Sequence, residues 1–202
     1  IRDLHRDMGA LSSSGSWYVL LVNSASHGVF NVVERMDEEF FASHLGPGRF
    51  DVIKTGNTVL SGTRQGWEEL RKFISTTDFS NQANYEELSR RVDIENFTAY
   101  VILNLWVLNL DWPHNNWRAA RERIPGAKFR FYVWDAEWSL GNQGRSVNGN
   151  TLTGELSGGA DIARLYQSLM NSPEFRLRWA DRFHKLFFNG GPFEDDRNLE
   201  RY

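Results

Sequence analysis

Two segments carry most of the architectural information in this sequence: Asn109-Leu-Asp-Trp-Pro-His-Asn-Asn-Trp117 and, after a turn, Phe131-Tyr-Val-Trp-Asp-Ala-Glu-Trp-Ser-Leu-Gly141. Both segments place polar side chains beside strand-forming residues, since Asp111 and Asn116 lie in a polar loop and Asp135 ends an apolar strand. Two strands that flank polar loops would bring Asp111, Asn116 and Asp135 together. We therefore expect these three residues to form one site.

The spacing within this group fits a phosphoryl-transfer site. Asp111 and Asn116 are five positions apart, as are the Asp and Asn of the protein-kinase catalytic loop D-x-x-x-x-N. In that chemistry one Asp accepts the proton of the substrate hydroxyl, while the Asn and a later Asp hold Mg²⁺ or Mn²⁺ through oxygen atoms. Taken alone, the pattern is also typical of Asp and Asn residues that cap helices or form turns.

Upstream of these segments, the sequence predicts a small β-rich unit. Residues 17–22 and 29–33 are rich in strand-forming residues and are joined by a polar turn, which is typical of a β-hairpin. Residues 37–45 have the pattern of a helix that ends before Gly-Pro, and residues 49–54 return to strand character. We interpret residues 1–60 as part of a small lobe, built from a hairpin, a helix and a strand.

Helical periodicity dominates the rest of the chain, and we interpret residues 61–202 as a helical lobe that carries the polar loops. An amphipathic helix is predicted around Trp67, and Asp93 is a suitable N-cap for a second helix that is apolar on nearly every face. A closing pair of helices is predicted at 161–170 and 173–188.

The Gly- and Asn-rich stretch 141–159 has the composition of a long mobile loop. Residues 194–202 have the pattern of a helix that begins there, and we expect the sequence to be truncated at both ends. We interpret three arginines as cations that solvate a helix face, with contact to an acidic substrate as the alternative: Arg118, Arg121 and Arg123.

The composition excludes several classes of protein. The chain has 202 residues, of which 41% are hydrophobic and 14% aromatic, so it can bury a core. Its formal net charge of −3 gives no general attraction to nucleic acid, which we do not expect as a partner. With 0 Cys it has no disulfide framework and no cysteine nucleophile, and its longest apolar stretch is too short for a membrane span.

Three segments in order resemble the CotH family. The run Gly28-Val-Phe-Asn-Val-Val-Glu-Arg-Met-Asp37, followed by Phe40, resembles its pattern G-x-Y-x-L-x-E-x-x-D-x-x-F. The two segments quoted first are similar to its N-x-D…N and W-D-x-D-x-x-x-G segments, with Glu137 as the second acid. Pro173-Glu-Phe-Arg176 with Arg182 resembles its later N-P-x-F-R…R helix.

The CotH family consists of atypical protein kinases of spore coats and of secreted or surface proteins. The resemblance implies an α+β, divergent protein-kinase-like fold that uses ATP and Mg²⁺ or Mn²⁺ to phosphorylate Ser or Thr hydroxyls of a protein substrate. It implies Asp111 as the catalytic residue, and Asn116 and Asp135 as metal ligands. It also implies an extracellular location or one at the cell or spore surface.

The nucleotide-binding part of the pattern is incomplete. No G-x-G-x-x-G precedes the hairpin, and no lysine that would hold the α- and β-phosphates is visible upstream of Trp17; such a lysine would then precede Ile1. Glu34 could pair with a phosphate-binding lysine and Lys54 could reach a phosphate, so both are candidates for cofactor binding. A solvated strand-end Glu and a surface Lys are the alternatives.

Two other functions remain open at this stage. One is a surface-binding or adhesin module that keeps the fold without catalysis, although such a module has no physical need for Asp111, Asn116 and Asp135 together. The other is a metal-dependent hydrolase that uses the same carboxylates on water, and metal binding without affinity for ATP would favour it.

Overall fold

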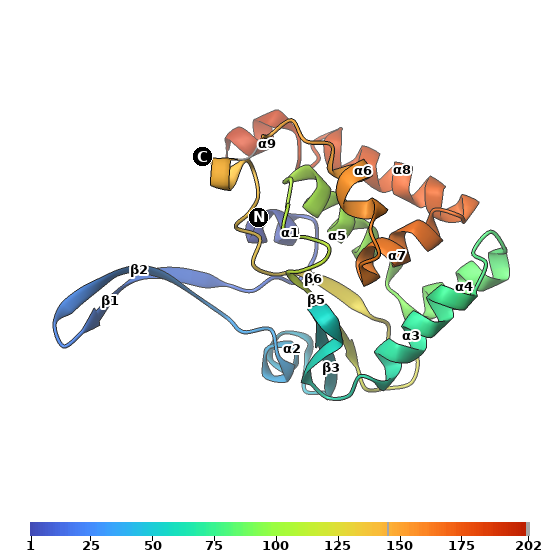
Figure 1. The fold of residues 1–202 in the computed structure, drawn as a ribbon, viewed down its shortest axis with the longest axis horizontal. Coiled ribbons are helices and arrows are strands. Elements are labelled where there is room, and N and C mark those ends of the chain that lie inside the picture. Colours follow the sequence, from blue (N-terminus) through green and yellow to red (C-terminus); the bar gives the residue numbers. More distant parts are fainter. Residues whose placement is uncertain (145, 201–202) are drawn as a thin grey trace.

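The computed structural model describes residues 1–144 and 146–200. It contains an antiparallel four-stranded sheet in the order β4-β3-β5-β6, formed by β3 (Phe50–Lys54), β4 (Thr58–Ser61), β5 (Trp117–Glu122) and β6 (Arg130–Val133). Helices cover this sheet, and a separate two-stranded hairpin projects from it (Figure 1). The mixture of helices and strands confirms an α+β fold.

The sheet joins distant parts of the chain. β3 lies between β4 and β5, with Val52 opposite Ala120, and β5 pairs in turn with β6. The strands therefore come from both sides of residue 60, and the segments 1–60 and 61–202 share one sheet. β4 was not expected from the sequence, because its four residues are too short to give a periodic signal.

The central helix is α5 (Ile94–Trp106), which packs against β6. Asp93 caps it as expected, since its carboxylate accepts a hydrogen bond from the backbone N–H of Asn96 at 3.1 Å. Phe97, Tyr100 and Leu103 are all fully buried, because the helix lies between the sheet and α8 (Pro173–Phe187). The largest core cluster therefore lies on this face of the sheet.

Several helices surround this core. They are α1 (Arg2–Asp7), α3 (Gln65–Thr76), α4 (Gln82–Arg91), α7 (Asp161–Leu169) and α9 (Asp195–Leu199). α1 packs on α5 and α3 packs on α7. The predicted closing pair of helices is confirmed as α7 and α8, whereas α1 had no detectable pattern in the sequence.

The opposite face of the sheet is covered by α2 (Glu38–Leu45), which packs on β3. A smaller apolar cluster fills this interface, with Phe41 and Val52 fully buried. Asp37 caps α2 by accepting from the backbone N–H of Phe40 at 3.3 Å. The two faces of the sheet thus carry separate apolar clusters, one under α5 and one under α2.

Two sequence interpretations were wrong. The segment with Arg118, Arg121 and Arg123 is not helical, because residues 117–122 form the central strand β5 and Arg123 follows it. The stretch 141–159 is not one structureless loop, because it contains the short helices α6 (Thr151–Gly154), η2 (Asn142–Gly144) and η3 (Glu155–Ser157). Leu156 and Thr151 are buried, so this stretch packs on the body of the protein.

The predicted hairpin is confirmed as β1 (Gly15–Val22) and β2 (Ala25–Val33), and it extends away from the body (Figure 1). Its apolar side chains are exposed, including Trp17 at 71% and Val29 at 63%. Neither apolar core cluster contains a residue of the hairpin. The hairpin therefore contributes little to the stability of the rest of the fold.

Shortening the hairpin tests this conclusion. Replacing residues 18–30 by an Asn-Gly turn keeps the cross-strand pair Trp17–Asn31 and should change Tm by less than about 2 °C. Calorimetric melting of parent and shortened protein measures the difference. The control is Trp112→Ala, which removes a fully buried core side chain and should destabilise the protein by about 3–5 kcal/mol. A shortened protein as unstable as this control would show that the hairpin does stabilise the rest of the fold.

His5 in α1 is a buried titratable group. It is 0% exposed, its ring contacts Tyr100 with the ring centroids 6.4 Å apart, and neither ring nitrogen has a hydrogen-bond partner among the described residues. Burial lowers the pKa of His5 to about 4. The folded protein therefore holds a neutral imidazole that the unfolded chain would protonate below its ordinary pKa of 6.5.

This burial predicts a pH-dependent stability. The unfolded state binds the extra proton, so the free energy of unfolding should fall by about 3 kcal/mol as pH drops from 6.5 to 4, with no loss above 6.5. Urea unfolding at several pH values measures this slope, and His5→Phe should reduce it. His27→Gln, a change in the exposed hairpin, is the matched control and should leave it intact. Equal slopes in parent and His5→Phe would refute the prediction.

Candidate functional site

The two polar segments lie side by side, tied by backbone hydrogen bonds. The N–H of Leu110 donates to the carbonyl of Trp138 at 3.1 Å, and the N–H of Leu140 donates to that of Val107 at 2.7 Å. β5 and β6 then pair with Trp117 opposite Val133. Because Asn116 precedes β5 and Asp135 follows β6, these two residues lie at the same end of the strand pair.

Asp111 is the centre of a hydrogen-bonded loop. Its Oδ2 accepts from Nδ2 of Asn116 at 2.8 Å, and its Oδ1 accepts from Nδ2 of Asn115 at 3.0 Å. Nε2 of His114 lies 3.3 Å from the same Oδ1. The bond from Asn116 fixes the orientation of its amide, and this leaves the amide oxygen available to another partner. The sequence-predicted pair Asp111 and Asn116 is therefore in direct contact.

Asp135 belongs to a second acidic group. Burial is the main cause that raises the pKa of Glu137, and a hydrogen bond to the Asp135 carboxylate and the negative charges of Asp135 and Asp111 raise it further. Glu137 therefore lies within hydrogen-bonding distance of Asp135, and the Asp111 carboxylate is near enough to act on Glu137. Glu137 was noted in the sequence only as the family's second acid, and its contact with Asp135 is a finding of the structure.

The backbone at both proposed ligand positions is left-handed. Asn116 has φ 56° and Asp135 has φ 52°, whereas most residues with a side chain avoid this region. Asn and Asp tolerate it better than other residues, so a purely local turn role is one explanation for them. Backbone strain of this kind also clusters at functional sites, and here it coincides with the acidic group.

The donor set fits a hard divalent cation. Asp135, Glu137 and Asn116 offer carboxylate and amide oxygens, and a bound cation would offset the repulsion between the two neighbouring carboxylates. Among the described residues, no group of three or more His, Cys, Asp or Glu side chains could hold a metal ion by itself. The set therefore suits a cation such as Mg²⁺, which takes one or two carboxylates and completes its shell with phosphate oxygens and water.

A pocket adjoins this acidic group. Its volume is about 430 Å³, and it lies between the end of β6, α1 and the base of the hairpin. Asp135 and Glu137 line it together with Trp17, Asn31 and Trp134, while Asp111 and Asn116 are outside its lining. Its volume falls within the range of small-molecule sites. The acidic group therefore borders a space of the size that small-molecule ligands occupy.

The two other predicted residues, Glu34 and Lys54, are not among the residues that line this pocket. Glu34 accepts from the backbone N–H of Ser14 at 2.7 Å and lies 3.0 Å from Nε2 of His44, and its pKa is lowered mainly by the Ser14 bond. These described contacts of Glu34 do not involve Lys54. Lys54 ends β3 and lies opposite Arg118 in the sheet. Their roles in cofactor binding stay predictions.

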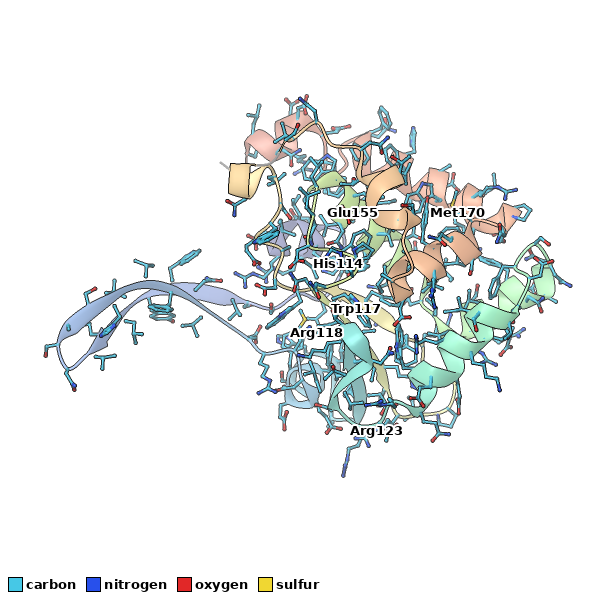
Figure 2. All side chains as sticks on the ribbon, viewed as in Figure 1. His114, Trp117, Arg118, Arg123, Glu155 and Met170 are labelled. Carbon is cyan, nitrogen blue, oxygen red and sulfur yellow. The ribbon has the colours of Figure 1, made fainter. Side chains whose placement is uncertain are left out.

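The sequence did not place Arg118 among the catalytic, metal or cofactor residues, and suggested at most a contact to an acidic substrate. Arg118 is the second residue of β5 and is only 9% exposed (Figure 2). Its Cζ atom lies 4.4 Å from the ring centroid of Trp134. Burial lowers the pKa of Arg118 to about 10, and the nearby Asp135 carboxylate opposes that shift. The only available signal was that this arginine follows the Asp111–Asn116 loop directly, on a strand rather than on a helix.

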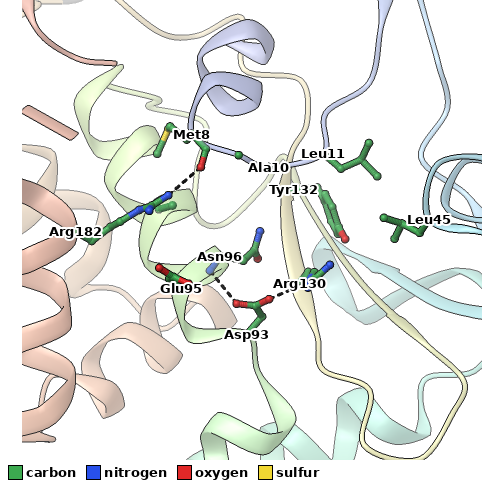
Figure 3. A pocket seen from close by; sticks show the side chains of 12 residues that line it. Met8, Ala10, Leu11, Leu45, Asp93, Glu95, Asn96, Arg130, Tyr132 and Arg182 are labelled. Atoms are coloured by element: carbon green, nitrogen blue, oxygen red, sulfur yellow. Dashed lines mark hydrogen bonds and ion pairs between the residues drawn. The ribbon is translucent and has the colours of Figure 1, made fainter. Parts of the chain in front are cut away.

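A second pocket, drawn in Figure 3, has a structural explanation. Arg182 donates to the carbonyl of Met8 at 2.9 Å and so joins α8 to α1, while Asp93 caps α5 and pairs with Arg130 at 2.9 Å. No residue predicted for catalysis or metal binding lines this pocket. Arg182, part of the third resembling segment, therefore acts as a structural tie.

Comparison with known proteins identifies the family of this chain. The family model described as "CotH kinase protein" matches residues 1–196, which is nearly the whole chain. A search of curated proteins finds no match. In the part of the chain that the structure describes, no helix combines the length and apolar character that a membrane crossing requires. With almost its full length matched, the chain belongs to the CotH kinase protein family.

Proposed function

We propose that this chain binds ATP with Mg²⁺ or Mn²⁺ and transfers the γ-phosphoryl group to Ser or Thr hydroxyls of proteins. The observation that carries the proposal is the position of the Asp135–Glu137 pair beside the Asp111–Asn116 pair. Phosphoryl transfer requires metal ligands and a group that orients the attacking hydroxyl, and little else from the protein. Membership of the CotH kinase family supports the same class of reaction.

Each residue has a distinct task in this proposal. Asp135, Glu137 and the amide oxygen of Asn116 would hold the cation, which when bound supplies positive charge against the phosphate oxygens. Asp111 would orient the substrate hydroxyl and accept its proton. The hydrogen bonds from Asn115 and Asn116 hold the Asp111 carboxylate in one orientation, so the base is positioned before substrate arrives.

The proposal extends to the arrangement and location of the protein. The sheet and helices would correspond to a divergent kinase-like fold, in which residues 1–60 contribute to a small lobe and 61–202 to the helical lobe. Glu34 and Lys54 would lie toward the nucleotide. The association of the CotH family with spore coats supports action at a cell or spore surface, on protein substrates that the sequence does not identify.

The test follows the fate of labelled γ-phosphate from ATP with Mg²⁺ or Mn²⁺, using the protein itself and a Ser-rich peptide as acceptors. A kinase gives phosphoserine or phosphothreonine with little free phosphate. Free phosphate with no labelled protein or peptide would indicate the hydrolase instead. Absence of ATP binding in the folded protein would favour a binding module of the same fold.

A further inference from the structure

Arg118 is a buried cation whose hydrogen-bonding capacity is mostly unused. A guanidinium has five N–H donors, and the described bond of this one is from Nη1 to the carbonyl of Trp117 at 3.0 Å. Its Nε is buried and has no hydrogen-bond partner among the described residues. Leaving a buried charged donor unpaired is costly, so the site is incomplete without an acceptor.

The charges around Arg118 favour an anion as that acceptor. Arg118 and Lys54 are directly opposite on neighbouring strands, so both side chains leave the same face of the sheet. The positive charge of Arg35 also acts on Arg118, and Asp135 is the nearby carboxylate that opposes these cations. If Asp135 is engaged by a divalent cation, its charge no longer balances Arg118. A group with several negative charges would then satisfy this cluster.

Arg118 lies next to the pocket that Asp135 and Glu137 line, although it is not itself one of the lining residues. Its guanidinium stacks on Trp134, and Trp134 lines the same pocket as Asp135 and Glu137. Stacking holds the planar guanidinium in a fixed orientation, which lowers the entropy lost when it binds two oxygen atoms. The fork of an arginine suits phosphate oxygens in this bidentate way.

We propose that Arg118 binds the phosphate chain of the nucleotide. This inference rests on the proposed function, because it concerns the same nucleotide site. The phosphate contact would then come from β5, directly after the Asp111–Asn116 loop. It would lie on the face of the sheet that also carries the side chain of Lys54.

The experiment measures affinity for a non-hydrolysable ATP analogue and for adenosine by calorimetry with Mg²⁺, in the parent and in Arg118→Gln. The parent should prefer the triphosphate, and Arg118→Gln should lower triphosphate affinity by roughly tenfold to hundredfold while adenosine affinity stays the same. Arg118→Lys keeps the charge but not the fork, and should lose severalfold less than Arg118→Gln. Arg123→Gln is the matched control, because Arg123 lies beyond the other end of β5 and pairs with Glu38 (Figure 2).

The outcomes separate nucleotide binding by the protein from phosphate binding by Arg118. A parent that binds neither compound overturns the proposed function and this assignment together. A parent that prefers the triphosphate, with the same preference in Arg118→Gln, overturns only the role of Arg118. If Arg118→Gln does not fold, the Lys variant decides, because a triphosphate preference equal to that of the parent shows that the fork makes no phosphate contact.

Discussion

Asp135→Ala is expected to abolish metal-dependent binding of ATP and to lower phosphoryl transfer by ~10³-fold or more. The substitution removes the carboxylate that neighbours Glu137 and that lines the pocket. Glu137 alone cannot replace it, because the proposed cation needs both carboxylates and the amide of Asn116. Calorimetry with ATP and Mg²⁺ or Mn²⁺ measures the binding, and label incorporation measures the transfer.

A control separates this effect from a general loss of structure. Asp181→Ala removes an exposed carboxylate on α8 and should leave binding and transfer at the level of the parent. Because Ala tolerates the left-handed backbone at position 135 less well than Asp does, the melting temperature of Asp135→Ala should fall by only a few degrees, and the protein should stay folded at the assay temperature. ATP and metal binding by Asp135→Ala equal to that of the parent would show that the metal site is elsewhere.

Asp111→Asn should reduce kcat by ~10²–10⁴-fold while the affinity for ATP and metal changes little. The asparagine keeps an oxygen that can accept the hydrogen bond from Asn116, but it cannot take the proton of the substrate hydroxyl. Steady-state kinetics with a Ser-containing peptide and calorimetry on the same preparation separate the two quantities.

Asp111→Ala serves as the comparison, because it also removes the acceptor for Asn116. It should weaken metal binding in addition to slowing transfer, since the Asn116 amide is then free to rotate. If Asp111→Asn retains the kcat of the parent, then Asp111 is not the proton acceptor. The Asp111–Asn116 contact would in that case be a turn-forming pair, which is the alternative that the spacing alone allows.

The features that the sequence predicted well are those with local causes. The β1–β2 hairpin follows from two strand-forming runs around a polar turn, and α5 follows from the Asp93 cap and a continuous apolar surface. The contact between Asp111 and Asn116 is also local, because both residues belong to one short loop. These features depend on residues that are close in the chain, so the pattern contains the necessary information.

The features that the sequence did not predict depend on distant partners. Arg118 is buried because Trp134 of another segment covers it, and its own neighbours in the chain gave the opposite expectation of a solvated helix face. His5 is buried by α5, about a hundred residues further along the chain, through contact with Tyr100. The exposure of the hairpin is likewise a property of the tertiary arrangement, since its composition alone would predict a buried strand pair.

The most direct test of the account locates the cation. A crystal grown with Mn²⁺ and a non-hydrolysable ATP analogue gives the metal position from its anomalous scattering. The account predicts Mn²⁺ within coordination distance, about 2.0–2.3 Å, of side-chain oxygens of Asp135 and Asn116, and bound also to phosphate oxygens. Mn²⁺ bound away from both residues, with the nucleotide in place, would contradict it.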